Sequence, residues 1–145
     1  MHLLRTLLPA TLLLGVLPVT PARAETSRNQ VIAAYVQAWS EAAPEKRRQL
    51  LEQAVVEQVQ YLDPYSSAGS RKALDALIRD AHAQLPGLRG EVVGRLRQTG
   101  NAGLFEWKMY GAGGEVLFYG VDAVSFAADG RLQRIEGFFE TRLQQ

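Results

Sequence analysis

The sequence predicts an α+β fold, with helices packed on one face of an antiparallel sheet. Two observations lead to this prediction. The first half of the chain contains three segments with helical spacing of apolar residues and one strand-like run among them. The second half is a series of long alternating runs separated by turns that contain glycine. Gly94, Gly120 and Gly137 lie inside predicted strands, where glycine suits bulges and strong curvature.

Three helices are expected. The first spans 27–42, with Ser27 as N-cap and one apolar face made of Val31, Ile32, Tyr35, Val36 and Trp39. The second covers roughly 44–54, because proline is favoured in the first turn of a helix. The third begins after Ser70 as N-cap and stops at Pro86-Gly87.

The strands follow from alternation. The β-branched run at 55–62 is ended by Asp63-Pro64. Four further strands are predicted at about 88–98, 103–110, 115–126 and 131–142. Asp129-Gly130 connects the last two, and this dipeptide is typical of a tight hairpin because glycine tolerates positive φ.

The first 24 residues resemble a secretory signal peptide rather than part of the fold. Arg5 gives a positive start, 7–17 is an apolar stretch too short to cross a bilayer, and Ala22-Arg23-Ala24 is an A-x-A cleavage site. We therefore expect a signal peptide at 1–24 and a single mature domain at 25–145. The mature protein would be periplasmic or secreted and would carry no membrane anchor after cleavage.

Composition narrows the possible functions. Removing Arg5 and Arg23 from the 16 basic residues leaves 14 against 15 acidic residues, a net charge of −1. A near-neutral chain gives no electrostatic reason to expect nucleic acid or an anionic membrane as partner. The chain has no cysteine, and His82 is the only histidine after position 24. The side chains needed for a thiol nucleophile are therefore absent, and a Ser-His-Asp triad or a zinc site would have only one histidine. We expect no metal and no cofactor.

Three residues are candidates for chemistry. Asp63 follows a strand and is either a turn-forming aspartate or a general base. Tyr35 lies on the apolar face of the first helix, either as a core aromatic or as a hydrogen-bond donor to a substrate oxygen. Asp122 shares a strand face with Val124 and Phe126, so it lies either at a wet strand end or in a pocket where burial perturbs its pKa.

The strings IAAYVQAW, YLDP and GVDAVSF, with the hairpin around Asp129-Gly130, resemble the nuclear transport factor 2-like superfamily, which includes SnoaL-like cyclases and ketosteroid isomerases. The resemblance implies a cone-shaped sheet, with a pocket at its wide end. It also implies the isomerase roles: Tyr35 at the oxyanion, Asp63 as base, and Asp122 as a protonated acid. Val55 stands where the isomerases have a supporting tyrosine, so the hydrogen-bond network of the isomerases is incomplete here unless Tyr61 or Tyr119 substitutes.

The first functional expectation is therefore an exported SnoaL-like domain that binds a small, mostly apolar molecule. Its ligand-binding residues would be Trp39, Val59, Tyr61, Val124 and Phe126. The alternative is a cofactor-free acid–base enzyme of isomerase or cyclase type, which uses Asp63, Tyr35 and Asp122. A third possibility is a structural dimer with a filled cone.

A homodimer is expected in any of these cases. An antiparallel sheet covered on one side leaves its other face to water or to a partner. Tyr110 and Phe118 are expected on that open face.

Overall fold

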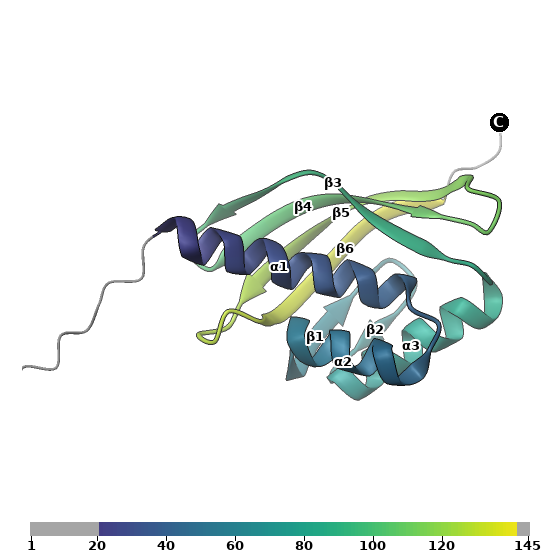
Figure 1. Cartoon of the computed structure of the whole chain (residues 1–145), viewed down its shortest axis with the longest axis horizontal. Helices are drawn as coiled ribbons and strands as arrows, with labels where there is room; N and C mark the ends of the chain where they lie inside the picture. Colours follow the sequence, from purple (N-terminus) through teal and green to yellow (C-terminus); the bar gives the residue numbers. More distant parts are fainter. Residues whose placement is uncertain (1–20, 142–145) are drawn as a thin grey trace, which may run out of the picture.

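The computed structural model describes residues 21–141, and side chains within 27–139. The elements in chain order are α1 (Pro21–Ser40), α2 (Pro44–Ala54), β1 (Val55–Leu62), β2 (Ser67–Ala68), α3 (Arg71–Gln84), β3 (Arg89–Thr99), β4 (Ala102–Tyr110), β5 (Val116–Phe126) and β6 (Leu132–Thr141). Figure 1 shows α1 lying across the long strands, with α2 and α3 beside its C-terminal half. Within the described residues, no helix is long and apolar enough to cross a membrane.

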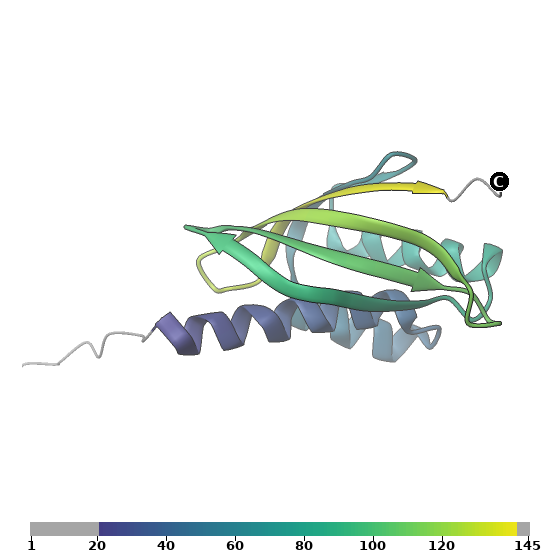
Figure 2. The same cartoon turned by 90° about the horizontal axis from the view of Figure 1, so that it is seen from above.

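The strands form one sheet of six in the order β2-β1-β6-β5-β4-β3. Figure 2 shows the long strands bending along their length, so the sheet is curved and unclosed. The predicted α+β class is confirmed. The prediction of a wholly antiparallel sheet needs one correction, because β1 pairs with β6 in parallel. No hairpin connects these two strands, so local turn geometry does not set their relative direction.

Strict alternation places the inner face of the sheet. Along β4, the buried residues are Gly103, Phe105, Trp107 and Met109. Along β5 the buried residues are Gly120, Asp122, Val124 and Phe126. The sequence predicted that the last three of these share one face of the strand. Side chains of α1 and α3 complete the core from the other side. Burial of such apolar surface contributes roughly 25 cal/mol per Å² to folding.

Three details of the local prediction were wrong. The first helix begins at Pro21 rather than after Ser27, and it ends at Ser40. The short strand β2 was not expected, although it pairs with the end of β1. Phe118 does not lie on the open face, since its ring packs edge-on against Phe139 at 5.6 Å beside the inner cavity. Residues 1–20 of the predicted signal peptide lie outside the described residues.

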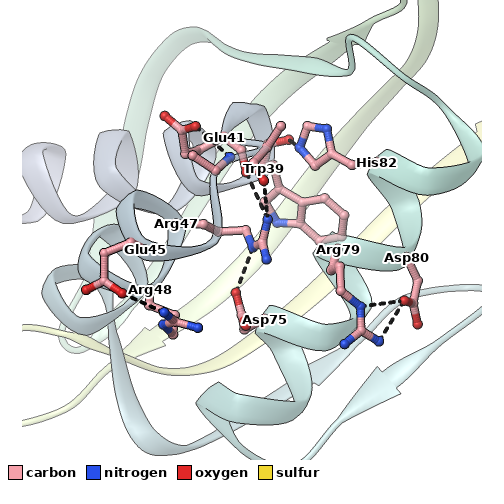
Figure 3. A network of polar contacts seen from close by, with 11 residues as sticks. Trp39, Glu41, Glu45, Arg47, Arg48, Asp75, Arg79, Asp80 and His82 are labelled. Atoms are coloured by element: carbon pink, nitrogen blue, oxygen red, sulfur yellow. Dashed lines mark hydrogen bonds and ion pairs between the residues drawn. The ribbon is translucent and has the colours of Figure 1, made fainter.

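A buried arginine joins the helices (Figure 3). Arg47 on α2 is 1 % exposed. Its Nε donates to Asp75 Oδ1 on α3 at 2.6 Å, and its Nη1 donates to the carbonyls of Glu41 and Ala42 at 3.2 and 3.1 Å. These contacts satisfy carbonyls just beyond the end of α1 and hold α3 against the α1–α2 turn.

Candidate functional site

A cavity of about 820 Å³ lies between α1, α3 and the inner face of the sheet. Seven of its lining residues are aromatic: Tyr35, Trp39, Tyr61, Tyr65, Trp107, Phe118 and Phe139. On α3 the wall includes three short side chains, Ala73, Ala76 and Ala81, which leave space next to the helix. Asp63, Asp122, Ser66 and Ser67 add polar groups.

Asp122 is the buried acid of the cavity. It is 3 % exposed, and its Oδ1 accepts a hydrogen bond of 2.7 Å from Trp107 Nε1. Burial raises the pKa of Asp122 to about 7, and the nearby charge of Asp63 acts in the same direction, while Trp107 and Tyr35 act against it. A carboxyl group with this pKa exchanges a proton readily near neutral pH.

Tyr35 comes from the middle of α1 and is 3 % exposed. Its ring packs edge-on against Phe105 at 6.4 Å, so helix and sheet fix its position together. Burial, with the neighbouring Asp122 and Tyr61, raises the pKa of the Tyr35 hydroxyl well above its usual value. The hydroxyl therefore keeps its proton and remains a hydrogen-bond donor.

Asp63 is held by its own turn. Its Oδ1 accepts from the backbone N–H groups of Tyr65 and Ser66, both at 2.7 Å. Its Oδ2 accepts from the hydroxyls of Tyr61 at 2.6 Å and Ser66 at 2.8 Å. A carboxylate offers about four acceptor positions, so these four donors occupy all of them. In this arrangement Asp63 has no free lone pair for a substrate proton. The contacts match the first of the two interpretations of Asp63, that of an aspartate that stabilises its own turn.

Two glycines on the inner face make room for these groups. A Cβ at Gly120 would lie 2.5 Å from Cζ2 of Trp107, so the indole can cover this position only because no side chain is present. A Cβ at Gly137 would lie 3.2 Å from Asp122 Oδ1 and 3.5 Å from Asp63 Cβ. Gly137 therefore separates the two aspartates, which explains how the charge of Asp63 reaches Asp122.

The three candidate residues Tyr35, Asp63 and Asp122 line the same cavity. Of the expected ligand-binding residues, Trp39 and Tyr61 also line it, whereas Val59, Val124 and Phe126 are buried in the core and are not among its lining residues. Tyr61 is a second tyrosine of the cavity that acts as a hydrogen-bond donor, because its hydroxyl donates to Asp63.

The sequence did not predict that Trp107 acts as a hydrogen-bond donor in the site. Its indole N–H donates the hydrogen bond to Asp122. Pairing β4 with β5 through the turn at 111–114 sets Trp107 opposite Gly120, two residues from Asp122 on the same face. Counting back from that turn gives this pairing, apart from one register shift next to the turn. Ser66 and the alanines of α3 were also missed. The position of Ser66 depends on the conformation of the turn after β1, and the positions of the alanines depend on how α3 packs.

His82 contacts α1 rather than the cavity. Its Nε2 lies 3.1 Å from the carbonyl of Trp39, near the C-terminal end of α1 (Figure 3). Within the described part of the chain, no group of three or more histidine, aspartate or glutamate side chains is arranged to hold a metal ion.

The structure is similar to several solved proteins. A proposed isomerase of the SnoaL-like family from Agrobacterium tumefaciens str. C58 is 30 % identical, with a TM-score of 0.73 over 79 % of this chain and 98 % of that one. A proposed SnoaL-like polyketide cyclase from Jannaschia sp. CCS1 is 12 % identical, with a TM-score of 0.66 over 86 % and 91 % of the two chains. A proposed polyketide cyclase from Sinorhizobium meliloti is 16 % identical, with a TM-score of 0.58 over 74 % and 92 %.

The latter two similarities concern the fold alone. No protein-family model and no curated protein sequence matches the chain. The Agrobacterium protein, however, is covered almost completely, at 30 % identity and with a TM-score of 0.73. The chain therefore belongs to the SnoaL-like family of the nuclear transport factor 2-like superfamily.

Proposed function

We propose that this protein is an exported domain that binds a small, mostly apolar molecule in the cavity between α1, α3 and the sheet. The observation that carries the proposal is the cavity itself, at about 820 Å³. Small-molecule sites are concave, of roughly 300–1,000 Å³, and mostly apolar with a few polar groups that fix orientation. The aromatic wall and the polar end around Asp122 and Asp63 fit that description.

A cavity-filling substitution tests binding. Ala76→Phe on α3 would occupy space next to the aromatic wall, whereas Ala83→Phe on the same helix places the same ring in solvent. We expect naphthylethanol, a neutral aromatic probe, to bind the wild-type protein and the Ala83→Phe variant, and to lose most of its affinity for Ala76→Phe in calorimetric titration. Equal affinity for all three proteins would contradict the proposal. Native mass spectrometry of protein purified from its own host would identify the natural ligand.

A second candidate function is acid–base catalysis, and Asp122 favours it. The best general acid or base has a pKa near the working pH, and the pKa of Asp122 is raised by burial to about 7. The four hydrogen bonds on Asp63 support a modified assignment, in which Asp122 moves the proton and the Tyr35 hydroxyl donates to the substrate oxygen.

Deuterium exchange at the α-carbon of a cyclic ketone, followed by NMR in heavy water, tests this candidate. We expect exchange above the solvent rate with the wild-type protein and none with Asp122→Asn. Exchange that survives in Asp122→Asn but disappears in Asp63→Asn would restore Asp63 as the base. Absence of exchange with the wild-type protein, together with probe binding, would leave the binding function alone.

Export rests on the N-terminal pattern of Arg5, the apolar stretch and Ala22-Arg23-Ala24. We propose cleavage after Ala24. Sequencing of the N-terminus of exported protein should then begin at Glu25. Protein found in the cytoplasm with Met1 intact would contradict this.

We also propose a homodimer through the open face of the sheet. Leu62, Phe138 and Tyr119 are exposed there by 52, 61 and 42 %, more than is usual for large apolar side chains in strands. Sedimentation at micromolar concentration should show a dimer, and Phe138→Ser should shift it toward monomer. A wild-type protein that sediments only as monomer would overturn the proposal.

A further inference from the structure

We propose that the cavity selects an organic cation, namely an amine or quaternary ammonium group attached to an apolar body. This inference rests on the proposed binding function and adds the charge of the ligand. It follows from three observations: the charges around the cavity, the arrangement of its aromatic rings, and the surroundings of Asp122.

The charges that line the cavity are of one sign. Asp63, Asp80 and Asp122 are lining residues, and within the described part of the chain no lysine, arginine or histidine is among them. Asp80 at the rim is paired with Arg79 at 2.8 Å, so its charge is largely offset. Asp63 and Asp122 remain, and Asp63 has the acceptor-only hydrogen bonding of an ionised carboxylate. A carboxylate or phosphate ligand would meet repulsion without any compensating cation.

Each of these two aspartates accepts a hydrogen bond from one ring of an aromatic pair. Trp39 packs on Tyr61 with ring centroids 5.9 Å apart, and Tyr61 donates to Asp63. Trp107 meets Phe139 at 5.3 Å and donates to Asp122. The face of an aromatic ring carries negative electrostatic potential and attracts a cation within about 6 Å. Two ring pairs next to two carboxyl groups therefore create an environment that stabilises positive charge.

Within the described residues, Asp122 has no cationic partner, although a buried carboxylate usually has one. Buried carboxylates in proteins are normally paired with a cation. The side chains that shift the pKa of Asp122 are Trp107, Tyr35 and Asp63. Of these three, only Asp63 is charged, and its charge is negative like that of ionised Asp122. An ammonium group in the cavity would supply the missing counter-ion. It would bind the ionised form of Asp122, so binding releases a proton wherever Asp122 is still protonated.

Three probes of matched size separate charge from shape: naphthylethylammonium, naphthylethanol and naphthylacetate. Their affinities are measured by calorimetric titration at mildly alkaline pH, where Asp122 is ionised. We expect the ammonium probe to bind about tenfold or more tighter than the alcohol, and the carboxylate probe to bind most weakly. The Asp122→Asn variant keeps the shape of the side chain but removes its charge. Its affinity for the ammonium probe should fall close to its affinity for the alcohol. Asp129→Asn makes the same change in an exposed turn outside the cavity and should preserve the preference.

The outcomes distinguish this inference from the binding function. Equal affinity for ammonium and alcohol, tighter binding of the carboxylate, or a preference that persists in Asp122→Asn would overturn the cation inference and leave the binding function standing. Failure of all three probes to bind the wild-type protein would overturn both.

Discussion

The indole of Trp107 holds the carboxyl group of Asp122 from the neighbouring strand, with 2.7 Å between Nε1 and Oδ1. Both side chains point to the inner face, and both line the cavity. The hydrogen bond favours the ionised acid, whereas burial favours the protonated acid, and burial is the larger effect. The balance leaves Asp122 able to exist in either form near neutral pH.

Removing the indole donor should shift this balance. In Trp107→Phe we expect the pKa of Asp122 to rise from about 7 by roughly one to two pH units, since a hydrogen bond to a charged group is worth about 1.5–3 kcal/mol. NMR titration of the carboxyl carbon measures it. Trp39→Phe removes the other tryptophan of the cavity, which is not among the groups that shift the pKa of Asp122, and should change this pKa little. Equal pKa values in Trp107→Phe and wild type would show that the indole does not hold the acid.

Asp122 should also make stability depend on pH. Its pKa is about 7 in the folded state against 3.8 without burial. The folded state therefore keeps a proton that the unfolded chain releases. This contribution is fully present below about pH 4 and is lost as the pH rises to about 7, by at most about 4 kcal/mol. Urea unfolding of wild type and Asp122→Asn at several pH values measures the difference. The free energy of unfolding of the variant should decline less over this range, while Asp129→Asn should leave the decline in place.

Most of the fold could be predicted because its determinants are local. Strand ends at Thr99, Tyr110 and Phe126 agree with the prediction within a residue, since alternation stops at turns that contain glycine or asparagine. The parallel pairing of β1 with β6 could not be predicted in this way, because it joins segments more than seventy residues apart.

The candidate site could also be predicted only in part: its residues could be named from the sequence, but their hydrogen bonds could not. Tyr35, Asp63 and Asp122 were candidates from residue type, from position on a helix or strand and from the family resemblance, and all three line one cavity. The four hydrogen bonds on Asp63 depend on the conformation of the turn, and the bond from Trp107 depends on strand register. Arg47 is the middle of three consecutive basic residues. The sequence pattern alone does not show which of the three faces inward. Its partner Asp75 is 28 residues away on another helix.

Gly120 allows the indole of Trp107 to lie across its strand. In Gly120→Ala the new Cβ would lie 2.5 Å from the indole and 2.9 Å from the backbone oxygen of Phe138, so the ring must move. We expect a loss of about 1–3 kcal/mol in the free energy of unfolding, together with a changed near-ultraviolet circular dichroism spectrum. Gly69→Ala is the matched control, because its Cβ would contact only the side chain of Gln60 at 3.9 Å. Equal stability of the two variants would contradict this account of the packing.

The ion pair of Arg47 and Asp75 predicts the largest loss of stability. Arg47→Met keeps an apolar side chain of similar length, but it leaves Asp75 and two backbone carbonyls without their donor. We expect a cost of about 3 kcal/mol, the lower end of the range for breaking a buried pair on one side, because the Asp75 side chain is 21 % exposed. Arg48→Met removes the neighbouring, exposed pair with Glu45 and should have little effect.

The double variant Arg47→Met with Asp75→Leu tests the cause. If the cost arises from the unpaired carboxylate of Asp75, replacing both partners recovers most of it, because no buried charge is left without a partner. Urea unfolding of the two single variants and the double variant completes the cycle. A double variant as unstable as the sum of its parts would show that Arg47 acts mainly through the carbonyls of Glu41 and Ala42, by holding the α1–α2 turn rather than α3.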